Sequence, residues 1–178
     1  MKRKRVVIGV LTFAAISAVA FAQGLKTIKE ILTGYEEVPS VSTAGNGQFN
    51  ARISNDASRI DWQLSYSELE STVTQSHIHL GQAGVNGGIS VFLCTNLGNG
   101  PAGIQACPQP PAVISGTIVA ADVSPNIAAT SGARGQGLNT GELDELIAAM
   151  RAGKTYVNIH TSLIPGGEIR SQIANGAP

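Results

Sequence analysis

The sequence is poor in cysteine, aromatic residues and charge, and each shortage excludes a class of protein. Its 178 residues include 2 Cys, 4% aromatic and 13% charged residues. Two cysteines cannot form a disulfide-dense scaffold, and low charge with 43% hydrophobic residues is not the composition of a disordered chain. The 21 glycines follow no three-residue period, which excludes collagen. Twelve basic and twelve acidic residues leave no net charge with which to attract nucleic acid.

The N-terminal residues 1–22 have the pattern of an export signal. Four basic residues, 2–5, precede an uncharged run that ends in Ala20-Phe21-Ala22. This pattern predicts a signal peptide that is cleaved after Ala22. Because the apolar run is slightly long, the alternative is an uncleaved N-terminal anchor. Both interpretations place the remaining chain outside the cytoplasm, in the periplasm or the extracellular medium, and no later stretch is long enough to span a membrane.

The two cysteines, Cys94 and Cys107, flank a stretch rich in Gly, Pro and Asn. Thiols outside the cytoplasm tend to oxidise, so we expect a disulfide between them rather than two free thiols. Closing this loop contributes about 3 kcal/mol in the chain-entropy model. A two-cysteine metal site is a weaker interpretation, because the spacing is too long for a Cys-x-x-Cys knuckle.

The body of the chain alternates between apolar and polar residues with a period of two. In the range 58–69, Ile60, Trp62 and Leu64 alternate with polar side chains, which is typical of a half-buried strand. Short strands separated by Gly and Pro predict a mainly β fold, an antiparallel, Greek-key-like β-sandwich or barrel. Further strands are expected at 30–36, 48–53, 73–80, 89–94, 112–120, 155–161 and 168–173.

One segment, 140–152, departs from this pattern and predicts a short α-helix. Leu143, Leu146 and Met150 recur at helical spacing, Thr140 is placed to cap the start, and Gly153 ends the segment. We expect this helix to cover an open edge or end of the sheet. The preceding residues, 125–137, are expected to form a flexible loop.

The three histidines of the chain fall on two predicted strands. His77 and His79 are two residues apart and therefore share a face, opposite Ile78. His160 alternates with Val157 and Ile159 in the same way, so all three imidazoles point away from the core. Two histidines on one strand and a third from another element predict a Cu or Zn site. The alternative is three polar residues on a solvated or partly covered face.

The pairing of odd-numbered and even-numbered residues in the last two predicted strands gives His160 a candidate partner. If 155–161 and 168–173 pair with their isoleucines in the core, even-numbered residues lie opposite each other. His160 then faces Glu168 or a neighbour two residues away, and Arg170 lies near Asn158. We expect Glu168 to orient His160 as a hydrogen-bond acceptor behind the metal ligand. Glu36 and Glu37, in contrast, are interpreted as a strand end and turn.

Several motifs occur in a fixed order along the chain: Tyr35-Glu36-Glu37-Val38-Pro39, Ile60-Asp61-Trp62-Gln63-Leu64, His77-Ile78-His79-Leu80-Gly81, Tyr156-Val157-Asn158-Ile159-His160 and Pro165-Gly166-Gly167-Glu168-Ile169-Arg170. This ordered set resembles the CHRD domain, a family named from animal chordin and found in bacterial secreted proteins. The resemblance covers roughly Lys29 to Ile173 and implies a β-sandwich. Chordin binds bone morphogenetic proteins outside the cell, and its cysteine-rich modules have no counterpart here.

A second similarity concerns the histidines alone. His77-Ile78-His79 followed by a glycine, with a later His on a strand, is similar to the copper ligands of Cu/Zn superoxide dismutase. That family also has a β-sandwich and an intrasubunit disulfide. Its bridging histidine and zinc cluster have no counterpart, because all three histidines of this chain are already used.

These patterns lead to one main interpretation and two alternatives. We expect a signal peptide over 1–22, a short linker over 23–28, a CHRD domain over 29–174 and a tail over 175–178. The domain is interpreted as an extracytoplasmic, non-enzymatic binding module whose partner is an extracytoplasmic ligand or a metal, with Cu or Zn held through its histidines. The alternatives are a copper redox protein and a purely structural or adhesive domain.

Overall fold

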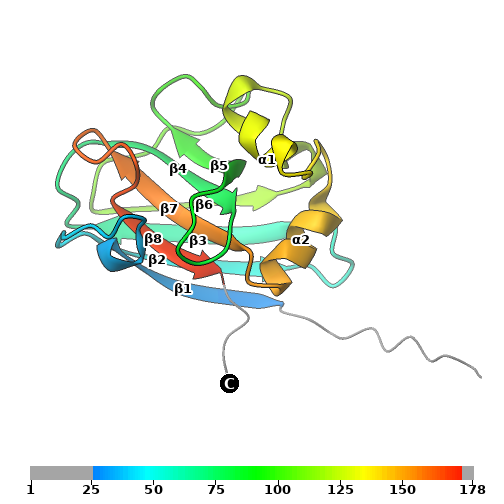
Figure 1. Cartoon of the computed structure of the whole chain (residues 1–178), viewed down its shortest axis with the longest axis horizontal. Helices are drawn as coiled ribbons and strands as arrows, with labels where there is room; N and C mark the ends of the chain where they lie inside the picture. The colour runs from blue at the N-terminus through cyan, green and yellow to red at the C-terminus, as the bar shows by residue number, and fades with distance from the viewer. Residues whose placement is uncertain (1–25, 174–178) are drawn as a thin grey trace, which may run out of the picture.

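Eight antiparallel strands form one sheet that curves into a nearly closed barrel (Figure 1). The computed structural model describes residues 26–173, so the predicted signal peptide and the tail lie outside the described residues. Within that range, no helix is long and apolar enough to cross a membrane. The strands follow the order β5-β4-β7-β8-β1-β2-β3-β6. Their bounds are β1 Thr27–Thr33, β2 Asn46–Ile53, β3 Ile60–Ser67, β4 Val73–Leu80, β5 Gly88–Thr95, β6 Ala112–Ile118, β7 Thr155–Thr161 and β8 Ile169–Ile173.

The period-two pattern accounts for most of these strands. β4 and β7 have the predicted bounds, and most of the others agree within two residues at each end. The exception is β1, which was expected at 30–36. It ends at Thr33, because Gly34–Glu36 form a 3₁₀ turn, η1. In β3 the predicted apolar face is the one that is buried in the core, while Asp61 and Gln63 are exposed.

The open seam of the barrel lies between β5 and β6, and the loop that joins these strands fills it. The side-chain amide of Gln105 donates to the carbonyl oxygens of Leu93 on β5 (3.1 Å) and Ser115 on β6 (3.3 Å). The backbone carbonyl of Gln105 accepts from the N–H of Thr95 (3.1 Å). One loop residue therefore links the two edges that do not pair directly.

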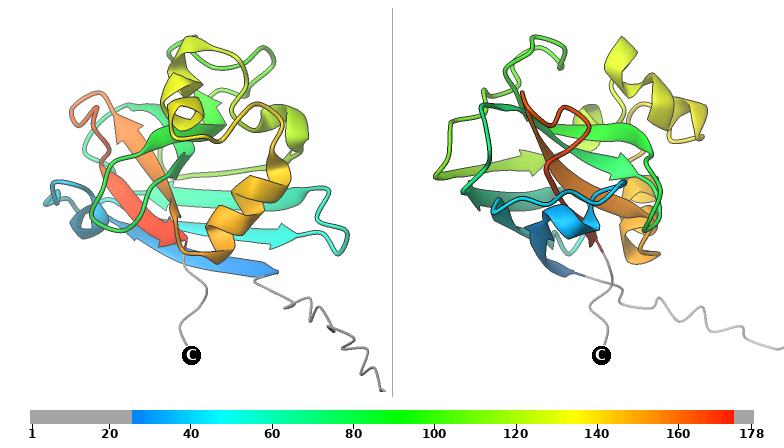
Figure 2. Two further views of the ribbon diagram at one scale, coloured as in Figure 1. Left: turned by 45° about the vertical axis from the view of Figure 1, so that its right-hand side comes forward. Right: turned by 60° about the vertical axis from the view of Figure 1, so that its left-hand side comes forward.

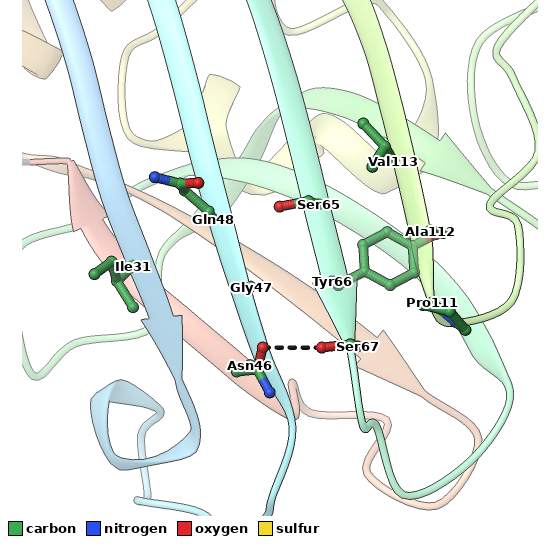
Figure 3. Close-up of a pocket in the computed structure, with 10 residues that line it drawn as sticks. All are labelled: Ile31, Asn46, Gly47, Gln48, Ser65, Tyr66, Ser67, Pro111, Ala112 and Val113. Atoms are coloured by element: carbon green, nitrogen blue, oxygen red, sulfur yellow. Dashed lines mark hydrogen bonds between the residues drawn. The ribbon is translucent and has the colours of Figure 1, made fainter.

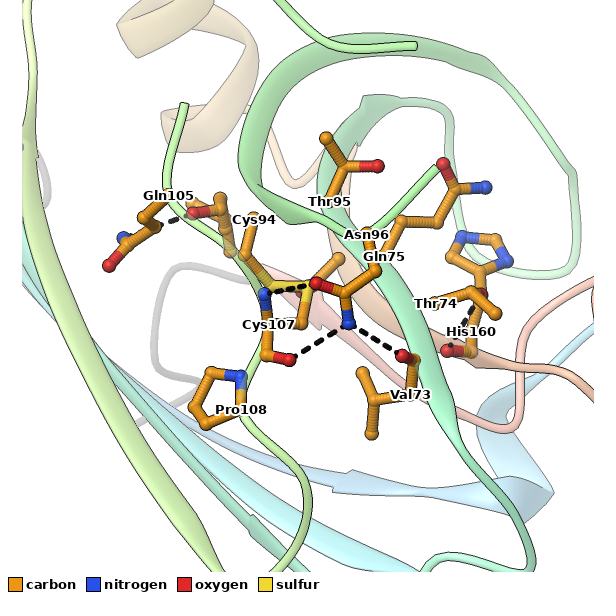
Figure 4. Close-up of a disulfide and its surroundings, with 12 residues drawn as sticks. Val73, Thr74, Gln75, Cys94, Thr95, Asn96, Gln105, Cys107, Pro108 and His160 are labelled. Carbon is orange, nitrogen blue, oxygen red and sulfur yellow. Dashed lines mark hydrogen bonds between the residues drawn. A yellow bond between two sulfur atoms is a disulfide. The ribbon is translucent and has the colours of Figure 1, made fainter. Parts of the chain in front are cut away.

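The expected disulfide between Cys94 and Cys107 is formed, and it fastens this loop to β5 (Figure 4). Asn96 strengthens the same junction. Its side chain donates to the carbonyl oxygens of Cys107 and Val73 and accepts from the N–H of Cys107. The covalent and hydrogen-bonded connections together hold the loop against β4 and β5.

The predicted helix is present as α2, Leu143–Arg151, and packs its apolar side on the core. The expected capping role of Thr140 is wrong. Glu142 occupies the N-cap position, and the Thr140 hydroxyl donates to the carbonyl of Ser124 instead (2.7 Å). The segment that was expected to be a flexible loop contains a second short helix, α1, Ser131–Gly135 (Figure 2).

Three hydrogen bonds from Arg134 hold the residues that precede α1 against this helix. Arg134 on this helix donates to the carbonyl oxygens of Pro125 (2.7 Å) and Ile127 (3.0 Å) and to the hydroxyl of Thr130 (2.6 Å). The arginine thereby connects α1 to the residues that precede it.

Removing the disulfide is expected to lower the free energy of unfolding without changing the fold. The bridge spans a sequence separation of 13 residues, for which the chain-entropy model gives about 3 kcal/mol. Equilibrium denaturation of the Cys94→Ala/Cys107→Ala variant measures this loss. Reduced wild-type protein is the control, and equal stability of oxidised and reduced chains would contradict the expectation.

Candidate metal centre

The pairing of β4 with β7 brings the three histidines together. These strands are antiparallel neighbours in which His77 lies opposite Asn158 and Gln75 lies opposite His160. Ile78, between the two β4 histidines, points into the core. The imidazoles therefore gather on the other face, and one potential ligand atom from each lies within 4.8 Å of the others. The prediction that the three side chains share a face away from the core is confirmed.

This face is covered rather than solvated. His77, His79 and His160 are 0%, 7% and 6% exposed. The ring of Phe92 meets His77 edge to face at 4.5 Å, and the ring of Tyr156 lies parallel to His79 at 4.6 Å. Aromatic side chains of β5 and β7 thus pack against the imidazoles.

Backbone carbonyl groups fix the orientation of two of the rings. The Nδ1 atom of His79 lies 2.9 Å from the carbonyl oxygen of Gly87, and the Nδ1 atom of His160 lies 2.9 Å from that of Pro165. A carbonyl oxygen only accepts hydrogen bonds, so both Nδ1 atoms carry the proton. In the neutral rings, each Nε2 atom then has a lone pair that is available to a metal.

The third ring completes a set of nitrogens with metal-ligand spacing. The Nδ1 atom of His77 lies 3.3 Å from the Nε2 atom of His160, and in the metal-free protein this contact is a hydrogen bond from His77 to His160. Only one nitrogen of His77 can bind the same ion as the other two rings. Two nitrogens bound at about 2.0–2.1 Å in a tetrahedral site are separated by about 3.3 Å. The Nε2 atoms of His77 and His79 are buried and have no hydrogen-bond partner in the described structure. Such orphaned groups are uncommon in folded proteins and indicate a missing partner.

Burial keeps the three imidazoles neutral. It lowers the pKa of His79 to about 3, lowers that of His77 well below its usual 6.5, and also lowers that of His160. The neighbouring histidines add to the effect on His77, and the Arg170 charge adds to that on His79. Neutral imidazole is the form that binds metals, so protons compete weakly at this site.

Gly87 makes hydrogen bonds through both its N–H and its carbonyl group, and the second of these fixes the orientation of His79. Its N–H donates to the hydroxyl of Tyr156 (3.1 Å) while its carbonyl accepts from His79. A Cβ atom at this position would overlap the carbonyl of Leu80, so only glycine fits. The guanidinium of Arg170 lies 3.4 Å above the Tyr156 ring, on the same ring that stacks with His79.

Arg170 also anchors the loop that leads to Gly87. It donates to the carbonyl oxygens of Gln82 (3.3 Å) and Val85 (3.0 Å) and to the side chain of Asn86 (3.2 Å). The loop between β4 and β5 is therefore tied to β8, and its last residue orients a candidate ligand.

The expected role of Glu168 behind His160 is wrong, although the parity argument was right. Tyr156 lies opposite Gln172, and Asn158 lies opposite Arg170. However, Glu168 precedes β8, and its carboxylate accepts hydrogen bonds from Thr161, Thr43 and the N–H of Glu70. The carbonyl of Pro165 takes the place that Glu168 was expected to fill.

Sequence reasoning missed Glu37, which was interpreted as a turn residue. It is 4% exposed, and burial raises its pKa to about 7 in spite of the opposing charge of Arg170 and the amide of Asn158. Its Oε1 atom has no hydrogen-bond partner in the described structure. No local pattern signals this burial, because Glu37 lies between the exposed Tyr35, two residues before it, and Pro39, two residues after it.

A surface groove on other strands carries no comparable chemistry (Figure 3). It follows the outer face of β1, β2, β3 and β6, where Ile31, Gln48, Ser65 and Val113 lie side by side across the sheet. A hydrogen bond from Ser67 to Asn46 (2.9 Å) crosses its floor. Its lining contains no histidine, cysteine or acidic residue, so among the described residues the histidine cluster is the stronger candidate site.

Comparison with known proteins gives a family but no characterised relative. The family model described as the CHRD domain matches residues 28–173, which is most of the chain. No curated protein and no solved structure matches the sequence.

The buried histidines predict that the metal-free protein loses stability in mild acid. Because their pKa values are lower when folded, the unfolded chain takes up more protons below about pH 6.5. The free energy of unfolding then falls with pH by up to about 1.4 kcal/mol per unit for each histidine. Glu37 acts oppositely between about pH 7 and 4.5, since its folded pKa is raised, but it is one group against three.

Denaturation of chelator-treated protein at pH 7, 6 and 5 measures this effect. The Glu37→Gln variant is the matched control, and its stability should fall more steeply as the pH is lowered. A free energy of unfolding that stays constant from pH 7 to 5 in both proteins would contradict the account.

Proposed function

The chain belongs to the CHRD domain family, and we propose that this member is an exported, non-enzymatic protein that binds one Cu or Zn ion through His77, His79 and His160. The observation that carries the proposal is the convergence of three buried imidazoles, whose potential ligand atoms lie within 4.8 Å of one another. Two of these rings are oriented by backbone carbonyls, as is usual for histidines that bind metals.

The donor set supports copper or zinc rather than a hard cation. Imidazole nitrogens suit Zn and Cu, whereas Mg and Ca require several oxygen ligands. No carboxylate joins the three nitrogens in the described cluster, and the two cysteines are consumed by their disulfide. Among the described His, Cys, Asp and Glu side chains, the cluster therefore offers nitrogen ligands alone.

The burial of the site supports binding rather than turnover. A copper redox enzyme needs a coordination position that its substrate can reach. The three ligands are at most 7% exposed, and loops and aromatic rings cover them. Export is supported by the predicted signal peptide and by a disulfide, which persists in oxidising compartments.

Replacing His79 is expected to abolish tight metal binding. Wild-type protein should bind about one Cu or Zn per chain, and an excess of metal 100-fold above Kd should stabilise it by about 2.7 kcal/mol. The His79→Ala and His79→Gln variants should lose both effects. Titration of the untagged protein, followed by thermal denaturation, measures them. Stoichiometric binding that persists in both variants would contradict the proposal.

The Tyr156 hydroxyl is expected to matter for metal affinity, because it holds the glycine that orients His79. Tyr156→Phe keeps the ring stack but removes the hydrogen bond from Gly87. Losses of this kind typically weaken metal binding about 10-fold to 100-fold. Tyr66→Phe is the matched control, because it also removes one hydrogen bond, to the carbonyl of Pro108, and leaves the site intact. Equal metal affinity in the two variants would refute the positioning role.

A further inference from the structure

We propose that the three-histidine site selects monovalent copper, Cu(I), over divalent ions such as Zn(II). The inference rests on the proposed function, since it names the ion that this site would hold. Three features of the described residues carry it: the charge of the ligands, the charge around them, and the number of ligands.

The ligand set is uncharged, so the ion itself determines the net charge of the site. An imidazole binds a metal through a neutral nitrogen, and no carboxylate or thiolate joins the three rings in the described cluster. The free energy of burying an ion rises with the square of its charge, so a divalent ion costs about four times as much as a monovalent one. A closed site without an anionic ligand therefore favours the monovalent ion.

The surrounding charge acts in the same direction. The guanidinium of Arg170, which is 1% exposed, lies over the Tyr156 ring that stacks on His79. Its positive charge repels a dication more strongly than a monocation. Glu37, a buried carboxyl group beside Arg170, has its pKa raised to about 7 by burial, so at neutral pH it balances the charge of Arg170 only in part.

The number of ligands leads to the same ion. Zn(II) almost always takes four ligands in proteins, and where the protein supplies only three, a water or substrate in an open position supplies the fourth. The described cluster supplies three nitrogens that are at most 7% exposed, and Phe92 and Tyr156, which pack against the rings, do not ligate metal. Cu(I) is stable with three nitrogen ligands and needs no fourth.

Competition with chelators of known affinity tests the selectivity on the full, untagged chain at pH 7. Cu(I) is delivered anaerobically with bicinchoninate, and Zn(II) with a chromophoric zinc chelator. We expect Cu(I) to bind at least 100-fold more tightly than Zn(II). The Asn158→Asp variant places a carboxylate of the same size beside His79 and should narrow this ratio at least tenfold. Asn50→Asp, on the outer face of β2, is the charge control and should leave it unchanged.

The outcomes separate this inference from the proposed function. A Cu(I) preference that Asn158→Asp narrows and Asn50→Asp does not supports the inference. Zn(II) binding as tight as that of Cu(I), still dependent on His79, overturns the selectivity and leaves the metal site in place. Failure of both ions to bind overturns the two proposals together.

Discussion

The antiparallel pairing of β4 with β7 is the constraint on which the candidate site depends. These strands are distant in sequence, and their register places His77 and His79 beside His160. The same register directs Ile78, Val157 and Ile159 into the core, so a shift by one residue would bury the imidazoles there and expose the isoleucines. The apolar core therefore fixes the geometry of a polar site that lies outside it.

Two loops contact these imidazoles on the outer face of the sheet, where the rings are buried. The loop between β4 and β5 and the loop between β7 and β8 each supply one carbonyl, from Gly87 and Pro165, to a histidine Nδ1 atom. Arg170 holds the first of these loops through two carbonyl groups and a side chain. Preorganisation of this kind reduces the cost of ordering the ligands when a metal binds.

Much of the fold and the grouping of the three histidines as candidate ligands could be predicted from the sequence, because both follow from a period of two. Alternation located β4 and β7, and parity placed Asn158 opposite Arg170. The environment of the ligands could not be predicted in this way. Burial of the histidines, the Pro165 carbonyl in place of Glu168, and the buried Glu37 all depend on irregular loops, whose paths have no periodicity.

The central claim is that one metal ion occupies the space between His77, His79 and His160. Anomalous X-ray diffraction at the copper and zinc absorption edges, on crystals of the metal-loaded protein, tests this claim most directly. The account predicts a single strong peak about 2.0–2.1 Å from one nitrogen of each imidazole. A peak that is absent there, or one bound to surface groups alone while the three rings keep their metal-free arrangement, would contradict it.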